Sequence, residues 1–271
     1  MSRIADVFAA RQKQQQMAFM PFLTAGDPDL SVTARLVQEL SAAGADLIEI
    51  GFPYSDPIAD GPVIQSSYTR ALGHKLQIPA IFSTIKTVSA KVQAPLVAMV
   101  SYAIIFRMGT ESFVKHAAEA GFAGLIVPDL PGDEADEFHR LVTSQGLDLI
   151  QLIAPTTPAD RSARILKNAS GFVYCIAVAG TTGAREALAP QLADMLKTLR
   201  SQTNLPLAVG FGLSRPEQVE QLRGLADGAI VGSAIVRHLE ALASGSGKID
   251  DVVRELVKYA SSIAAAAHAQ R

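Results

Sequence analysis

Two carboxylates with different surroundings stand close together in residues 46–65. Glu49 interrupts the aliphatic run of residues 47–50, which is typical of a buried strand in a parallel sheet. Asp60 ends a loop rich in Pro, Asp and Gly, and Pro62 is placed to begin a helix. A buried ionised carboxylate costs several kcal/mol unless it is paired or its pKa rises. We therefore expect Glu49 to point from a strand end into a pocket that Asp60 also faces, which would allow acid–base chemistry.

The sequence of this segment also allows a structural role for the same residues. Glu49 can form a structural ion pair, because a buried acid often has a basic partner. Asp56 and Asp60 can cap turns, as Asp often does.

The composition limits the classes of protein to be considered. With 271 residues and 49% hydrophobic residues, the chain can bury a large core, and we expect one domain over residues 1–271. A net charge of −2 gives no general attraction to nucleic acid or to an acidic membrane. Cys175 is the only cysteine, so a disulfide within the chain is impossible. Residues 1–16 lack the apolar run of a signal peptide, so a cytoplasmic location is expected.

A unit of apolar strand, polar or Gly-rich loop and helix repeats along the chain. This pattern predicts an α/β fold, a (β/α)8 TIM barrel with an extra N-terminal helix over residues 2–14 that closes the bottom of the barrel. A doubly wound sheet is the alternative, but no Gly-x-Gly-x-x-Gly follows the first strand. The helix after the first strand is expected to start at Pro28. The strands are expected at residues 17–23, 47–50, 96–100, 124–127, 147–153, 171–176, 206–209 and 228–231.

Glycine-rich loops follow the last three strands, at residues 180–183, 210–214 and 232–233. Barrels commonly bind phosphate after the seventh and eighth strands, where backbone N–H groups can approach the anion. The seventh and eighth loops contain no Lys or Arg, so we expect backbone dipoles to dominate phosphate recognition there.

Several motifs together make the chain similar to a known family. The chain resembles the alpha subunit of tryptophan synthase along nearly its full length. The most specific motif is residues 47–65, which includes PYSDPIADGP. Supporting motifs are PFLTAGDP at residues 21–28, PDLP at 128–131, LIAPTT at 152–157, GTTG at 180–183 and GFG at 210–212.

The resemblance implies a lyase of tryptophan biosynthesis. The implied reaction is retro-aldol cleavage of indole-3-glycerol phosphate to indole and glyceraldehyde 3-phosphate, with no metal or organic cofactor in this chain. Glu49 is the implied acid–base group at ring carbon C3 and at the chain hydroxyl, and burial is expected to raise its pKa. Asp60 is the implied acceptor of the indole N–H, and its polar loop is expected to leave it ionised.

The resemblance also implies three groups of binding residues. The indole pocket is expected to contain Phe22, Val100, Ile126, Tyr174, Thr182 and Phe211. The phosphate is expected at Gly183, Gly212, Gly232 and Ser233, and the loop that communicates with a partner is expected to contain Pro53, Asp56 and Pro57.

The partner implied by the resemblance is a beta subunit that contains pyridoxal phosphate and receives indole directly, in an alpha2-beta2 heterotetramer. Two positions depart from the pattern of the family. Ile104 occupies a position at which many members have Asn, so a hydrogen-bonding amide is absent. Many members have a Ser shortly before the sixth loop, whereas this chain has Val178 in that segment. These two departures keep open a stand-alone lyase that releases indole. A catalytically weak regulatory subunit that binds phosphate and a different phosphate-binding barrel enzyme are further alternatives, because the fold supports many functions.

Overall fold

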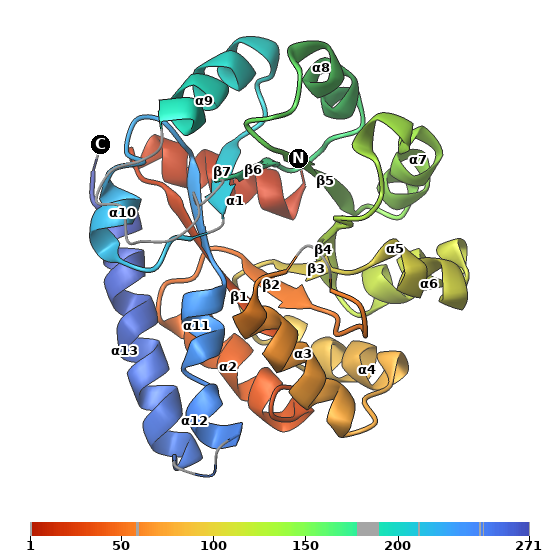
Figure 1. Cartoon of the computed structure of the whole chain (residues 1–271), viewed down its shortest axis with the longest axis vertical. Helices are drawn as coiled ribbons and strands as arrows, with labels where there is room; N and C mark the ends of the chain where they lie inside the picture. Colours follow the sequence, from red (N-terminus) through yellow and green to blue (C-terminus); the bar gives the residue numbers. More distant parts are fainter. Residues whose placement is uncertain are drawn as a thin grey trace.

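The computed structural model describes residues 2–57, 60–177, 190–210, 212–243, 245 and 247–270. Eight parallel strands close into a barrel in chain order, with β1 paired to β8, and helices surround it (Figure 1). The predicted TIM barrel is therefore confirmed. The strands are β1 (Ala18–Thr24), β2 (Ile48–Gly51), β3 (Leu96–Met99), β4 (Phe122–Ile126), β5 (Asp148–Ile153), β6 (Val173–Ile176), β7 (Leu207–Gly210) and β8 (Gly228–Val231).

One helix precedes the first strand, and the others lie between the strands and after the last one. Helix α2 begins at Leu30 and not at the expected Pro28, because the Asp29 carboxylate accepts hydrogen bonds from the N–H groups of Ser31 and Val32 and caps the helix there. The described helices are α1 (Arg3–Lys13), α2 (Leu30–Ala42), α3 (Pro62–Gly73), α4 (Ile78–Ser89), α5 (Tyr102–Met108), α6 (Thr110–Glu119), η1 (Gly132–Glu134), α7 (Asp136–Ser144), α8 (Ala159–Lys167), α9 (Pro190–Gln202), α10 (Pro216–Glu220), α11 (Ser233–Arg237), α12 (Glu240–Ala243) and α13 (Ile249–His268).

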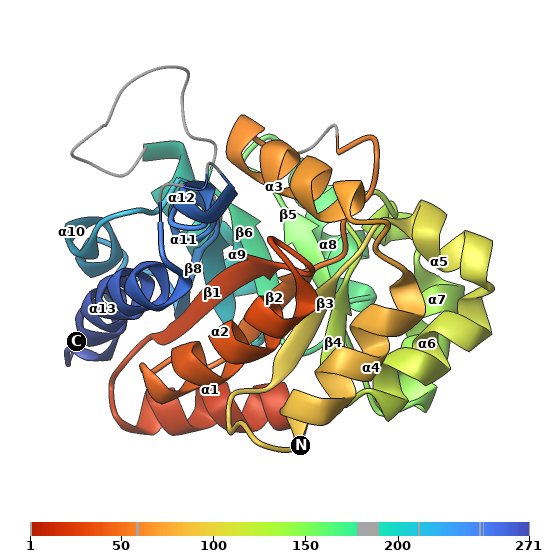
Figure 2. The same cartoon turned by 90° about the horizontal axis from the view of Figure 1, so that it is seen from below.

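The N-terminal helix α1 closes one end of the barrel, as the sequence predicted. Ile4 and Phe8 are buried and pack against apolar side chains of the barrel interior, including Phe172, whose ring centroid lies 5.6 Å from that of Phe8. Figure 2 shows α1 at the opposite end of the barrel from α3. The open end is therefore the one at which the strands finish, where TIM barrels carry their active sites.

The strand register determines which side chains meet at this open end. Phe22 on β1 pairs with Glu49 on β2, and Glu49 pairs with Val97 on β3. Leu47 belongs to the interior cluster, and side chains two residues apart on a strand share a face. Glu49 therefore points into the barrel, one layer above Leu47.

None of the helices in the described part of the chain combines the length and the apolar character that crossing a bilayer requires.

Candidate active site

A cavity of about 240 Å³ at the open end brings most of the predicted residues together. We call it the reaction cavity. Side chains from β1, β2, β3, β6 and β8 form its floor, and the start of α3, the turns after β7 and β8, and the end of α11 form its walls. It is lined by Phe22, Glu49, Asp60, Gly61, Pro62, Val63, Ile64, Met99, Tyr174, Gly212, Ile230, Gly232, Ser233 and Arg237.

Glu49 is a buried and isolated carboxyl group. Its side chain is fully enclosed, and within the described part of the chain neither carboxyl oxygen has a hydrogen-bond partner. Burial raises the pKa of Glu49 from its usual value to about 8. The structural ion pair considered from the sequence is absent among the described residues. At neutral pH Glu49 is mainly protonated, so it can donate a proton to a substrate.

Replacing Glu49 with Gln is expected to stabilise the protein at alkaline pH. The folded-state pKa of Glu49, about 8, lies above the unfolded value of about 4.3, so the folded state holds a proton that the unfolded state releases between these values. The stability of the wild type is therefore lost as pH rises through this window, and the Gln variant avoids that loss.

Urea unfolding of both proteins at pH 5 and pH 8 measures this effect. The advantage of Glu49→Gln should grow to a few kcal/mol, as an order of magnitude, at pH 8. An equal difference at both pH values would contradict the raised pKa.

Asp60 lines the same cavity as Glu49 and lies just before helix α3. It is partly buried, and burial raises its pKa from the usual value to about 6. The polar loop therefore solvates Asp60 less than the sequence suggested. Because this pKa lies below neutrality, Asp60 is still mainly ionised at pH 7. The cavity thus brings a mainly neutral acid and a mainly ionised carboxylate to the lining of one space.

The loop that carries Asp60 is held by α3. The Gln65 amide donates to the backbone oxygens of Asp60, at 2.7 Å, and Pro57, at 3.2 Å. Helix α3 is itself anchored to the turn after β1, because Arg70 forms a two-point ion pair with the buried Asp27, with an Nη2–Oδ2 distance of 2.6 Å. Asp60 is therefore positioned through a continuous set of contacts from β1 to α3.

Two glycines leave room for the aromatic walls of the cavity. A Cβ at Gly51 would clash with the ring of Phe22 and would lie 3.0 Å from the hydroxyl of Tyr68, and a Cβ at Gly210 would clash with the ring and hydroxyl of Tyr174. Both glycines end strands and lack the side chain that would occupy this space. The aromatic rings can therefore lie across the strand ends.

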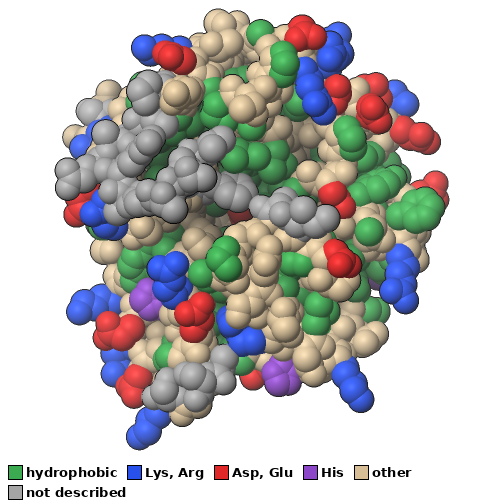
Figure 3. All heavy atoms as spheres, in the orientation of Figure 1, with side chains coloured by type: hydrophobic (Ala, Val, Ile, Leu, Met, Phe, Trp, Pro, Cys, Tyr) green, Lys and Arg blue, Asp and Glu red, His purple; other side chains and the backbone are tan. Residues whose placement is uncertain are grey.

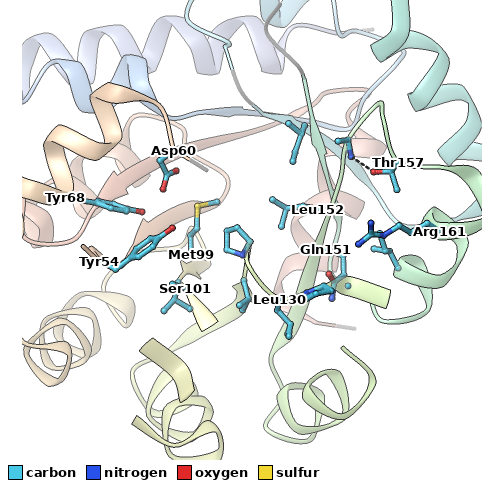
Figure 4. A pocket seen from close by; sticks show the side chains of 18 residues that line it. Tyr54, Asp60, Tyr68, Met99, Ser101, Leu130, Gln151, Leu152, Thr157 and Arg161 are labelled. Carbon is cyan, nitrogen blue, oxygen red and sulfur yellow. Dashed lines mark hydrogen bonds between the residues drawn. The ribbon is translucent and has the colours of Figure 1, made fainter. Parts of the chain in front are cut away.

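A second cavity of about 390 Å³ adjoins the first and shares Asp60 and Met99 with it (Figure 4). Its wall on the α3 side carries Tyr54 and Tyr68, whose rings are 5.7 Å apart, while Leu152 lies on the β5 side. The sequence analysis missed both tyrosines. For Tyr68 a signal was available, because Ile64 and Tyr68 are four residues apart on the helix that Pro62 begins.

The predicted binding residues separate into three sets. Phe22, Tyr174, Gly212, Gly232 and Ser233 line the reaction cavity, and Val100 lines the adjoining one. Ile126 lines neither cavity and packs within the barrel interior. Thr182, Gly183, Phe211 and Val178 lie outside the described residues.

The predicted partner loop lies on the outer side of the barrel mouth. Pro53 and Asp56 line a third cavity, of about 1010 Å³, together with Ile104, Met108 and Leu76. Pro57 follows Asp56 in the sequence, and its backbone oxygen accepts a hydrogen bond from the Gln65 amide. Near this outer cavity, Phe106 on α5 is 73% exposed, which is unusual for so large an apolar side chain. Figure 3 shows hydrophobic side chains on the side of the molecule where α5 lies and in the central hollow.

No group of three or more His, Cys, Asp or Glu side chains that could hold a metal ion occurs among the residues that the structure describes. Cys175 is buried, and burial raises the pKa of its thiol to about 12, so its thiolate is not available at neutral pH.

The fold and the cavity define a (β/α)8-barrel enzyme whose cavity at the ends of the strands contains two carboxyl side chains, Glu49 and Asp60, and a glycine-lined rim. The family model described as "Tryptophan synthase alpha chain" matches residues 8–268. The chain belongs to this family.

Individual relatives agree with the family model. The chain is 45% identical over 271 residues to the tryptophan synthase alpha chain of Rhodopirellula baltica, covering 97% of this chain and 98% of the relative. It is 44% identical over 264 residues to that of Gloeobacter violaceus, covering 96% of each chain. As a member of the family, the chain is a lyase of tryptophan biosynthesis that cleaves indole-3-glycerol phosphate.

Solved structures show the same barrel over its full length. Tryptophan synthase subunit alpha from Legionella pneumophila superposes with a TM-score of 0.88 at 33% identity, covering 98% of each chain. A chain of tryptophan synthase from M. tuberculosis, in an aminoacrylate-bound form, superposes with a TM-score of 0.86 at 28% identity, covering 98% of this chain and 100% of that chain.

Proposed function

We propose that Glu49 and Asp60 divide the acid–base work of indole-3-glycerol phosphate cleavage. The observation that carries this proposal is that a buried, unpartnered Glu49 and a partly exposed Asp60 line one cavity. Protonated Glu49 gives its proton to C3 of the indole ring, and Asp60 accepts the indole N–H and stabilises the positive charge that develops on the ring nitrogen. The Glu49 carboxylate then takes the proton of the adjacent chain hydroxyl as the bond from C3 to the chain breaks.

The binding groups follow from where the remaining side chains lie. The indole ring lies against Phe22 and Tyr174 on the floor and extends toward Val100. The phosphate lies at the rim formed by Gly212, Gly232 and Ser233, with Thr182, Gly183 and Phe211 contributing from segments outside the described residues. Helix α11 has five residues, so it supplies less dipole than the sequence suggested, and local N–H groups supply the contacts. Ile126, which pairs with the cavity residue Met99 and packs in the same apolar cluster as Tyr174, supports the floor.

The outer cavity and Phe106 form the docking face for a beta subunit. We propose an alpha2-beta2 assembly in the cytoplasm in which pyridoxal phosphate is held by the beta subunit, and a single domain over residues 1–271 that supplies the indole. Pro53, Asp56 and Pro57 connect this face to Asp60 along one loop. Ile104 adds apolar surface where many members of the family have an amide, so the interface is expected to depend more on burial of apolar area.

Release of indole by the free chain and by the chain with a beta subunit tests this assignment. We expect slow turnover alone and strong activation by the partner. The variant Phe106→Asp should reduce that activation about tenfold or more, because a charge replaces an exposed apolar anchor. The activity of each free chain is the reference, and Lys115→Gln on the neighbouring α6, which makes the net charge more negative by the same amount as Phe106→Asp, controls for the change of charge.

Equal activation of Phe106→Asp and wild type would remove α5 from the docking face. High turnover of the free chain with no response to the partner would favour the stand-alone lyase. Absence of indole under both conditions would contradict the assigned roles of Glu49 and Asp60.

A further inference from the structure

The reaction cavity contains a cationic side chain that the loop sequences did not predict. Arg237 is the last residue of α11 and lines the same cavity as Glu49, Asp60, Gly232 and Ser233. Ser233 and Arg237 are four residues apart, so they share one face of the helical turn. The sequence led us to expect that backbone dipoles dominate phosphate recognition, because the seventh and eighth loops contain no Lys or Arg, but Arg237 lies one helical turn beyond the eighth loop.

The guanidinium group of Arg237 is not held in a polar contact by the described residues. It is exposed, and no ion pair or side-chain hydrogen bond of its guanidinium group occurs in the described part of the chain. The acidic residue three positions later, Glu240, acts electrostatically on Arg70 instead. An unpaired guanidinium at the rim of a cavity is available to a ligand, since arginine suits planar, two-point recognition of phosphate.

The surroundings of Arg237 place it toward the turn after β7. Burial raises the pKa of Tyr259 to about 12, and the positive charge of Arg237 opposes that rise, so the two side chains are close enough to interact. The Tyr259 hydroxyl donates to the backbone oxygen of Ser214 at 2.9 Å. Ser214 follows Gly212, which is part of the same rim. Arg237 therefore stands between the turns after β7 and β8.

The charges in the cavity give Arg237 a function. Asp60 is mainly ionised at neutral pH and repels an anionic substrate, whereas Glu49 is mainly protonated and contributes little charge. Arg237 is the only Lys or Arg among the described residues that line the reaction cavity. A phosphate dianion would be bound more weakly there without this cation, because backbone N–H groups carry only partial charges.

We propose that Arg237 is a further substrate-binding residue, whose guanidinium group pairs with the phosphate of indole-3-glycerol phosphate beside Gly212, Gly232 and Ser233. The proposal rests on the phosphate position given under the proposed function and adds a side chain to it. Arg237 acts on binding, because the phosphate keeps its charge throughout the cleavage. The contact therefore stabilises the bound substrate and the transition state about equally.

Steady-state kinetics of Arg237→Gln, Arg237→Lys and Arg254→Gln test the proposal. Arg254 lies exposed on α13 in a surface ion pair with Asp251, so Arg254→Gln removes the same charge outside the cavity. Arg237→Gln should raise KM about tenfold or more with kcat within about threefold of wild type. Arg237→Lys should recover part of the loss, and Arg254→Gln should match the wild type.

Two further readouts separate a phosphate contact from a structural effect. The inhibition constant for inorganic phosphate should rise in Arg237→Gln by a factor similar to that for KM. In the reverse direction, condensation of indole with glyceraldehyde 3-phosphate should weaken, whereas condensation with unphosphorylated glyceraldehyde should proceed as in the wild type. A variant disturbed in structure would lose both condensations.

The outcomes that overturn the proposal are distinct from those that overturn the phosphate position. Any of three results would show that Arg237 does not bind the phosphate. These are a KM of Arg237→Gln within twofold of wild type, equal inhibition of both proteins by inorganic phosphate, or a loss of condensation activity in the variant that is as large with glyceraldehyde as with glyceraldehyde 3-phosphate. If the wild type shows no competitive inhibition by inorganic phosphate, the phosphate position itself is wrong, and the role of Arg237 fails with it.

Discussion

Glu49→Gln is expected to lower the rate of indole formation from indole-3-glycerol phosphate by about two to four orders of magnitude. Gln has nearly the same shape as protonated Glu, but its amide cannot transfer a proton to C3 or accept one from the chain hydroxyl. No other acidic side chain lines the floor of the reaction cavity among the described residues. Loss of this one group therefore removes both proton transfers.

The measurement is single-turnover indole release by saturating enzyme, which separates chemistry from binding. Glu119→Gln on the exposed surface of α6 is the matched control and should keep the wild-type rate. Substrate binding by Glu49→Gln should be close to that of the wild type, because the variant keeps the walls and the rim. A loss of less than tenfold would show that another group transfers the proton.

The pH dependence of kcat/KM is expected to be bell-shaped, with limbs near pH 6 and pH 8. Activity should rise with pH through the pKa of Asp60, about 6, because its ionised form stabilises the positive ring nitrogen. Activity should fall through the pKa of Glu49, about 8, because only the protonated form can donate to C3. Both shifts have the same physical cause, removal of the carboxyl group from water.

Asp60→Asn is expected to lower kcat about 10²- to 10³-fold, which is the usual effect of removing one preorganised electrostatic group. The neutral amide still accepts the indole N–H, so the loss falls on the charge that develops in the transition state. The acidic limb near pH 6 should disappear in the variant while the alkaline limb remains, as measured by kcat/KM from pH 5 to 9. Asp56→Asn is the control and should keep both limbs. Asp56 lies in the same loop, and its carboxylate accepts a hydrogen bond from the Ser55 hydroxyl.

If the acidic limb persists in Asp60→Asn, a group other than Asp60 is responsible for it. If the wild type has no alkaline limb near pH 8 and its activity instead rises through about pH 5, Glu49 is ionised at rest and must act first as a base. The two variants therefore test the order of proton transfer as well as the identity of the groups.

Some features of this protein follow directly from the sequence. The largely apolar runs indicated all eight strands, because a strand covered on both faces is mostly apolar. Pro62 specified the start of α3, because proline suits the first turn of a helix. The position of Glu49 inside the second apolar run marked it as exceptional, and the loop motifs identified the family.

Other features were decided only by the closed barrel. Whether the Glu49 carboxyl group has a hydrogen-bond partner depends on all the elements that surround it in the closed barrel. In that barrel, closed by the pairing of β1 with β8, neither carboxyl oxygen has a partner among the described residues. The same applies to Asp60, whose polar neighbours in sequence predicted good solvation, whereas α3 and the barrel rim partly bury it. Tyr68 and Arg237 enter the site from helices, where the direction of a side chain depends on how the helix packs on the barrel. Sequence thus determined the residue types and the elements, but tertiary structure decided their burial, distances and charges, because these arise from contacts between segments far apart in the chain.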